Sequence, residues 1–285
     1  LNLQFSNGIR LDVADPDNLG PFVSYDEGLQ GIADLLDEAA DDLGTAGDDF
    51  YFILSEGFDG FDTPASFLSF NRGLAARIAL YQGNNANALK FLDDSFIDEI
   101  IDEPEKLFVG PFRPYSTAGG EEVNPVFRSP NQSEALVAHP DFVAILDTLD
   151  MRSAKVQERE DPIALDDLSG DHDVVRWSSL SSSIPYIRNE ELILIRAEAS
   201  IGTDANAAIA AIDLIRISNG IEAYSGGNSE AELIDEVLAQ RRLSLYAEGH
   251  RWIDMRRYNR LDELPIDRVD DDVWEEFPRP VSEQE

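Results

Sequence analysis

The segment 248–257, EGHRWIDMRR, gathers the side chains of this sequence that are best suited to chemistry. Within ten positions it holds one of the three histidines, one of the three tryptophans, three arginines and two carboxylates. A histidine beside a carboxylate is typical of a general base or a metal site, whereas charges of alternating sign are typical of a structural clamp along a helix. The rest of the sequence decides between these two interpretations.

The chemical interpretation lacks the partners that it needs. No second His or Cys stands at metal-ligand spacing from His250, and no G-x-S-x-G motif presents a serine nucleophile. The chain has no cysteine, which excludes disulfides, thiol catalysis and Cys-ligated zinc. We therefore expect no catalytic residue, no metal and no cofactor. A glycosidase that uses two carboxylates stays open as an alternative, because 57 acidic residues always provide some suitable pair.

The spacing of the charges favours the clamp. Acidic and basic residues alternate from Glu248 to Arg257 at three-residue steps, which lets neighbours pair along a helix. Gly249 is less favourable than Ala inside a helix by about 1 kcal/mol, which predicts that another backbone approaches closely there. The predicted clamp consists of Glu248, Gly249, His250, Arg251, Trp252 and Asp254.

A long helix is expected to position this clamp. Ser229 and Glu232 have capping-box spacing and mark its first turn. One face carries apolar residues at steps of four, seven and seven, namely Ile234, Leu238, Leu245 and Trp252. We therefore expect the tryptophan of the clamp to pack into the core.

Further helices are predicted upstream from caps and helical periodicity. Ser24 and Glu27 have capping-box spacing before a helix that Gly44 stops, and Thr63-Pro64 starts a second helix that ends at Gly83. The remaining predicted helices cover 85–100, 190–201 and 205–218, the last followed by a C-cap at 219–220. The segments 64–97 and 185–219 are helical hairpins of about 34 residues, the tetratricopeptide length. The predicted fold class is all-α, with stacked hairpins that bury each other's faces.

Residues 101–184 interrupt the helical pattern. Pro, Gly, Ser and Asp are scattered through them, and a short helix near 140–149 is the only regular element that we expect there. No strand pattern of any strength is present. A stretch of this length without periodicity is functional or disordered in most compact domains.

The charge of the chain limits its partners. With 57 acidic and 22 basic residues the formal net charge is −35, and only three of the basic residues are lysines. So negative a surface disfavours nucleic acid and anionic membranes. Self-repulsion should destabilise the compact state in dilute buffer, whereas at molar salt the screening length falls to about 3 Å. The composition resembles that of halophilic proteins, and we expect the fold to be more stable at high salt.

Membrane insertion is not expected from the hydropathy of the chain. No apolar run approaches the roughly 18 residues that a spanning helix needs. The first residues lack the basic and then apolar pattern of a signal peptide.

Several separated motifs resemble one family. RNEELILIRAEASI at 188–201, AAIDLIRISNGI at 210–221, ELIDEVLAQRRLSLYAEGHRWIDMRR at 232–257 and FPRPVSEQE at 277–285 are similar, in order and spacing, to the C-terminal half of SusD/RagB proteins. This is the starch-utilisation-system D family. The resemblance extends less specifically over 24–100 and does not cover 101–184.

The resemblance implies a function that the residue chemistry alone does not give. Members of the family are lipoproteins on the surface of the bacterial outer membrane. They bind nutrients, mostly glycans, without catalysis, and they cover a TonB-dependent transporter of the SusC type. Their fold has tetratricopeptide-like hairpins on one side and irregular loops that carry the ligand site.

The resemblance also predicts the organisation of the chain. We expect one SusD-like domain over 1–285, without the N-terminal hairpin and the lipidated cysteine of the family. Within it we expect a helical hairpin region at 24–100, a variable ligand-side region at 101–184 and a helical scaffold at 185–285.

Candidate ligand residues lie in the variable region. Aromatic rings cover the flat C–H faces of sugars, while amides and charged groups bond the hydroxyls. Trp177 is the strongest candidate, although a loop tryptophan also serves to fix its loop on the core. The candidate set is Trp177, Tyr115, Phe112, Arg113, Asn131 and Gln132. The helical hairpins leave one further function open, a tetratricopeptide-like adaptor that binds a peptide or protein on its concave face.

Overall fold

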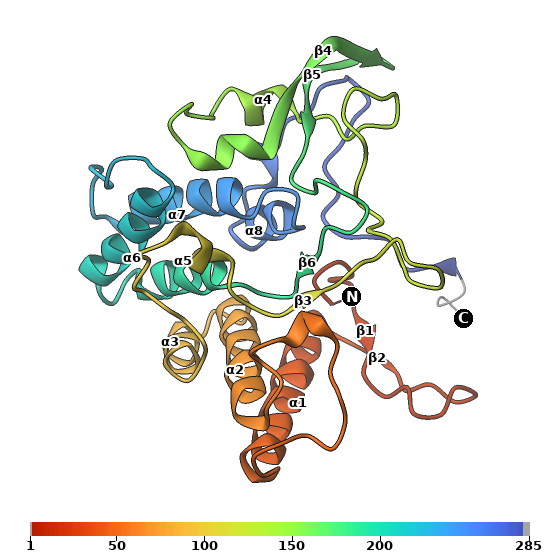
Figure 1. The fold of residues 1–285 in the computed structure, drawn as a ribbon, viewed down its shortest axis with the longest axis vertical. Coiled ribbons are helices and arrows are strands. Elements are labelled where there is room, and N and C mark those ends of the chain that lie inside the picture. Colours follow the sequence, from red (N-terminus) through yellow and green to blue (C-terminus); the bar gives the residue numbers. More distant parts are fainter. Residues whose placement is uncertain (1, 282–285) are drawn as a thin grey trace.

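Helices form most of the regular structure in the computed structural model, which describes residues 2–281 (Figure 1). The helices are α1 Tyr25–Thr45, α2 Pro64–Tyr81, α3 Asn85–Asp93, α4 Pro140–Val143, α5 Asn189–Ser200, α6 Ala205–Ser218, α7 Glu230–Ser244 and α8 Arg251–Arg257. The strands are β1 Ile9–Arg10, β2 Phe22–Val23, β3 Phe112–Arg113, β4 Val156–Leu165, β5 Leu168–Val174 and β6 Ile184–Pro185. The prediction of a mainly helical fold is confirmed.

The predicted helix starts are confirmed by their caps. The hydroxyl oxygens of Ser24, Thr63 and Ser229 each accept a hydrogen bond from the backbone N–H three residues later, and the residue at that position bonds back. These bonds satisfy backbone donors that a helix start leaves open. Gly220, with a φ of +84°, ends the turn after α6 as expected. The helix predicted over 85–100 is shorter, because α3 ends at Asp93.

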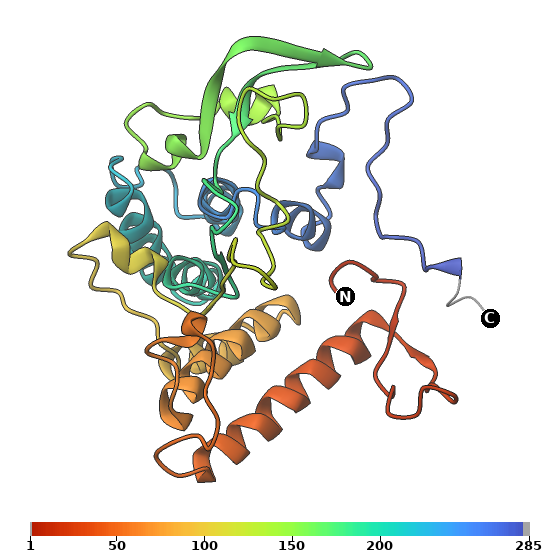
Figure 2. The ribbon, with the colours of Figure 1, turned by 45° about the vertical axis from the view of Figure 1, so that its right-hand side comes forward.

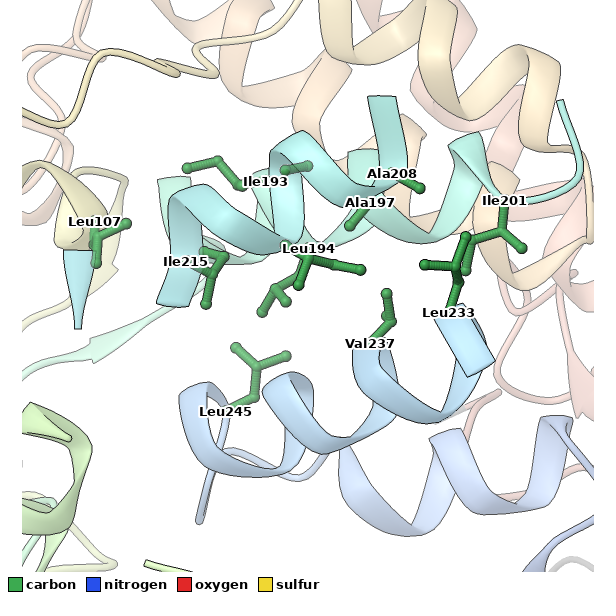
Figure 3. Packing of buried hydrophobic residues seen from close by; sticks show 12 residues of the cluster. Leu107, Ile193, Leu194, Ala197, Ile201, Ala208, Ile215, Leu233, Val237 and Leu245 are labelled. Atoms are coloured by element: carbon green, nitrogen blue, oxygen red, sulfur yellow. The ribbon is translucent and has the colours of Figure 1, made fainter. Parts of the chain in front are cut away.

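Helix α5 lies at the centre of the molecule and is buried on nearly every side. One face, with Ile193, Leu194 and Ala197, packs against α6 and α7 (Figure 3). The opposite face, with Leu192 and Ile195, packs against α2 and α3. Because residues three and four apart share a helix face, apolar residues on two opposite faces of α5 let it take part in both cores. Helix α1 covers the outer side of α2 and lies at the edge of the molecule (Figure 2).

The long helix that was expected to carry the clamp is in fact two helices. Helix α7 ends at Ser244 and α8 starts at Arg251, and the turn between them contains Ala247 and Gly249 at φ values of +62° and +83°. The positive φ at position 249 explains why a glycine stands there. The predicted close approach of another backbone is wrong, since a Cβ at this position would meet no atom within 4 Å.

This turn also changes the orientation of the tryptophan. Trp252 is only partly buried, so the prediction that it packs into the core is wrong. Its ring stacks on Phe277 with centroids 5.4 Å apart, and its Nε1 donates to the Trp274 carbonyl at 2.7 Å. The helical phase that Ile234 and Leu238 establish is lost across residues 245–250, so it cannot be extended to α8.

Residues 101–184 contain an antiparallel hairpin that the sequence did not predict. Strands β4 and β5 pair from Val156–Val174 to Leu165–Leu168, and the turn between them places Asp166 and Asp167 at positive φ. The expectation that this region has no strand is therefore wrong, and α4 is a single turn rather than a helix over 140–149. The hairpin is mostly exposed on both faces, which removes the alternation of apolar and polar residues that identifies a strand.

Candidate functional site

The clamp segment takes part in two buried charge networks. In the first, the Arg188 guanidinium bonds Glu248, the Glu190 carboxylate at 2.6 Å and the Ser244 carbonyl at 2.6 Å. Arg176 donates to Glu248 at 3.2 Å. Glu248 therefore joins the turn after α7 to the start of α5, instead of pairing with Arg251 along one helix.

The second network links α5, α7 and α8. Arg257 binds the Glu198 carboxylate through both Nη atoms and also donates to Asp254 at 3.0 Å. Asp254 accepts from the buried Arg241 Nε at 2.7 Å, and the Tyr258 hydroxyl donates to Glu198 at 2.7 Å. The Arg257–Asp254 pair has the predicted i,i+3 spacing. Charged groups removed from water need such partners, so this network fixes the three helices relative to one another.

A cavity of about 360 Å³ lies beside the first network. Aromatic walls come from Tyr81 at the end of α2, Trp177 in the loop before β6, and Tyr186 just after β6. Trp177 is buried, with 4% exposure, while Tyr186 is 43% exposed. The cavity therefore has one aromatic ring at its surface and two deeper in the protein.

Charged groups converge on the inner end of this cavity. Arg77 binds the Glu191 carboxylate with two hydrogen bonds of 2.6 Å and donates to the Tyr186 carbonyl at 2.8 Å. His250 Nε2 lies 3.9 Å from Glu191, and its Nδ1 lies 3.5 Å from the Tyr81 hydroxyl. The clamp histidine thus contributes to the cavity wall, whereas Asp254 does not line it.

Burial and charge pairing shift the pKa values of these groups. Burial alone would raise the pKa of Glu191, but Arg77, His250 and Arg241 outweigh it and lower the pKa to about 2. Burial raises the pKa of Tyr81 to about 12, and it lowers the pKa of His250 against the opposing effect of Glu191. At neutral pH the inner end therefore presents an ionised carboxylate, a guanidinium and a neutral phenol.

Three of the predicted ligand residues lie next to this cavity. Strand β3 pairs with β6, in the register Phe112–Pro185 and Arg113–Ile184, and residues 184–187 line the cavity. The Arg113 guanidinium lies 5.5 Å from the Tyr115 ring, and Arg113 also pairs with Glu122. The pairing of β3 with β6 thus brings Phe112 and Arg113 close to Tyr186, and Tyr115 lies beside Arg113. Their role in ligand binding stays a prediction.

The other two predicted ligand residues lie elsewhere, at the β4–β5 hairpin. The Asn131 backbone N–H donates to Asp173 at 2.5 Å, and its side-chain oxygen accepts from the Glu160 backbone at 3.0 Å. Gln132 is exposed, and its carbonyl accepts from Arg159 at 3.4 Å. These contacts connect the loop to the hairpin, and the structure does not bring the two side chains to the cavity.

Sequence reasoning missed Arg77, Tyr81 and Tyr186 as candidates. Arg77 and Tyr81 are four residues apart on α2, so they share a helix face that is otherwise buried. Two polar side chains on an otherwise buried helix face form a pattern that can be recognised from the helical periodicity of the sequence. Tyr186 stands directly before the predicted helix at 190–201, and nothing in its local pattern marks it.

Acid should weaken the structure through Glu191. Its pKa is lowered from 4.5 to about 2, so its contribution is complete above pH 4.5 and is lost as the pH falls towards 2. We expect this one group to account for about 3 kcal/mol of the loss in unfolding free energy over that range. Urea unfolding at a series of pH values measures it.

The variant Glu191→Gln provides the comparison for this pH series. It should be less stable at pH 7, because it leaves Arg77 without its carboxylate, and its stability should fall less steeply with acid. Glu105→Gln, at an exposed position, serves as the matched control. Parallel pH profiles for wild type and Glu191→Gln would contradict the assignment.

Comparisons with known proteins agree with this arrangement. The family model described as the SusD family matches residues 168–279. The SusD-like protein P38 of Formosa agariphila is 32% identical over 107 residues, which are 33% of this chain and 21% of that relative. This chain thus matches about a fifth of the length of that curated relative.

Solved structures extend the similarity to most of the chain. A laminarin-binding SusD-like protein is 18% identical with a TM-score of 0.62, covering 92% of this chain and 68% of that one. Surface glycan-binding protein A from Bacteroides uniformis is 17% identical with a TM-score of 0.58, covering 90% and 63%. The fold is SusD-like. The predicted resemblance to the SusD/RagB family is confirmed, with residues 168–279 as its most specific part.

Within residues 2–281, no three His, Asp or Glu side chains are grouped so that they could hold a metal ion. The longest helix, α1, has 21 residues but carries seven carboxylates, and none of the helices in that range qualifies as a membrane span.

Proposed function

We propose that this chain binds a nutrient glycan at the surface of the bacterial outer membrane and delivers it to a TonB-dependent transporter. The observation that carries the proposal is the cavity whose walls are Trp177, Tyr186 and Tyr81, within a SusD-like fold. Its volume of about 360 Å³ lies in the range of small-ligand sites, about 300–1,000 Å³. Aromatic faces with charged and hydroxyl groups behind them suit a sugar, which has apolar C–H faces and polar edges.

The state of the carboxylates supports binding without catalysis. A glycosidase needs one carboxylic acid whose pKa is raised, so that it can protonate the leaving group. In this cavity the pKa of Glu191 is instead lowered to about 2, and Glu248 is bound by Arg188 and Arg176. Glu191 is therefore not available as a general acid at neutral pH. Both groups fit a fixed polar wall that orients a ligand.

The same proposal includes the location of the protein in the cell and its partner. The surface glycan-binding and laminarin-binding proteins whose structures resemble this chain support a glycan as ligand. We infer a surface lipoprotein that covers a SusC-like barrel, in keeping with the SusD-family match at 168–279. Co-purification of a barrel protein with the tagged chain tests this partnership.

Binding should depend on the exposed ring of the cavity. Replacing Tyr186 with alanine removes a ring that a sugar can stack on, and we expect the affinity for the preferred oligosaccharide to fall at least about tenfold. A glycan array identifies the oligosaccharide, and isothermal titration calorimetry measures the change. Tyr51→Ala is the matched control, because Tyr51 is fully exposed and does not line the cavity.

Three outcomes would overturn the glycan proposal. Equal losses of affinity for Tyr186→Ala and Tyr51→Ala would show that the oligosaccharide does not bind in the cavity. Binding of peptides without binding of glycans would favour the adaptor function that the helical hairpins allow. Release of reducing ends that one Asp or Glu substitution abolishes would show an enzyme.

A further inference from the structure

Two larger cavities, of about 1,080 and 600 Å³, meet around a pair of arginines. Arg242 in the last turn of α7 and Arg251 at the start of α8 line both of them. In Figure 1 these two helices lie between the α5–α6 layer and α4. Neither arginine lines the cavity of Tyr186.

The two arginines differ from the others in their bonding. Within residues 2–281, the guanidinium groups of Arg242 and Arg251 form no hydrogen bond or ion pair, and the Arg251 Nε is shielded from solvent without an acceptor. Arg241, next to Arg242 in sequence, is by contrast paired with Asp254. A guanidinium has five N–H donors, so two unpaired guanidiniums leave many donors open.

Among the described residues no carboxylate forms an ion pair with either guanidinium, although Asp141 and Glu263 line the smaller cavity and act on Arg242 and Arg251 from a longer distance. Around the larger cavity Asp150 pairs with Arg152, Glu236 with Arg216, and Asp235 with Arg260. Burial and the neighbouring Arg242 lower the pKa of Arg251, against the opposing effect of Asp254 and Glu263. Two adjacent, partly buried cations that lack a hydrogen-bonded carboxylate would be stabilised by an anion that binds them from outside.

Aromatic rings complete the smaller cavity. Its walls include Trp252, Trp274, Tyr246 and Phe142, and Trp274 is 52% exposed. The Arg242 guanidinium lies 5.9 Å from the Phe142 ring, so the charged and aromatic parts of the wall are contiguous. This combination suits a sugar ring that carries an anionic substituent, because arginine binds carboxylate and sulfate groups through two parallel hydrogen bonds.

We propose that Arg242 and Arg251 bind the anionic group of an acidic glycan, a uronate carboxylate or a sulfate ester, whose ring lies against Trp252 and Trp274. This inference rests on the proposed function and specifies its ligand class. The smaller cavity adjoins the Tyr186 cavity, since Ala247, Gly249, His250 and Ile253 line both, so one polysaccharide chain can contact the two.

Calorimetry with three oligosaccharides tests the inference. The probes are trigalacturonate, a sulfated carrageenan tetrasaccharide and the neutral laminaritriose, at the lowest KCl concentration at which circular dichroism shows the folded protein. We expect at least one acidic probe to bind, and the probe that binds distinguishes carboxylate from sulfate. Arg242→Gln and Arg251→Gln should each weaken that binding at least about tenfold.

Arg128→Gln is the matched control for charge. Arg128 is exposed, donates only to backbone carbonyls and lies outside both cavities, so its substitution should change the affinity less than about twofold. Thermal unfolding provides a second measurement. Because an unpaired, partly buried cation is removed, Arg251→Gln should melt no lower than wild type. A change in tryptophan fluorescence on binding, reduced in Trp274→Phe, reports the site even if an arginine variant does not fold.

The possible failures are distinguishable. Binding of laminaritriose but of neither acidic probe would overturn this inference and leave the proposed function intact. Acidic binding that Arg242→Gln and Arg251→Gln leave unchanged would also overturn it. No binding of any glycan would overturn both proposals.

Discussion

Replacing Asp254 with alanine is expected to lower the free energy of unfolding by about 3–5 kcal/mol. Asp254 is buried and accepts the hydrogen bond from Arg241 Nε, and the next carboxylate, Glu198, is 4.0 Å from that atom. Arg241 is itself only 1% exposed, and its two Nη atoms have no acceptor. Without Asp254 the guanidinium would keep its charge in a site that water does not reach.

Urea unfolding at high KCl measures this loss. The control is Asp235→Ala, which breaks the exposed pair with Arg260 and should cost less than about 1 kcal/mol. The double variant Arg241→Met/Asp254→Leu should recover part of the loss, because it removes both charges together. If Asp254→Ala and Asp235→Ala cost the same, the network does not hold α5, α7 and α8 in place.

Salt should stabilise this protein strongly. Raising KCl from about 0.05 M to about 2 M is expected to add on the order of 3 kcal/mol to the unfolding free energy, or roughly 6–12 °C in melting temperature. Helix α1 shows the reason, because its seven carboxylates have no basic residue within the helix. Asp42 also stands in its last turn and Asp41 directly before that turn, where the helix dipole disfavours negative charge.

Thermal melting at the two salt concentrations tests this expectation. In Asp41→Asn/Asp42→Asn, melting at low salt should rise and the difference between the two salts should shrink. Asp37 is left unchanged, because it pairs with Arg72 of α2. Equal melting temperatures at 0.05 and 2 M KCl would end the halophilic interpretation.

Local signals in the sequence predicted the helices well. The cap residues Ser24, Thr63 and Ser229 act on backbone groups within three positions, so their effect can be read without the rest of the fold. The turn at 245–250 could not be read in this way, because Ala247 has no intrinsic preference for its positive φ. The β4–β5 hairpin was missed because it buries little, so its sequence lacks the alternation of a strand.

The candidate site was only partly predictable for a different reason. Trp177 was found because aromatic residues in an irregular region are conspicuous, but Tyr81 and Tyr186 reach the same cavity from α2 and from the end of β6. Convergence of distant segments is a property of the packed chain, not of any local pattern. The predictions for Asn131 and Gln132 relied on residue type alone, which does not specify the part of the fold that a side chain faces.

The central position of α5 has a consequence for the synthesis of the chain. Residues 25–93 form α1, α2 and α3, but the core of α2 and α3 includes Ile187, Leu192 and Ile195 from nearly a hundred residues later. On the ribosome these first helices therefore emerge without the surface that completes their interior, and their apolar faces stay uncovered until α5 has been made. A chain that stopped before α5 would fold poorly, and chaperones and proteases would recognise its uncovered apolar faces.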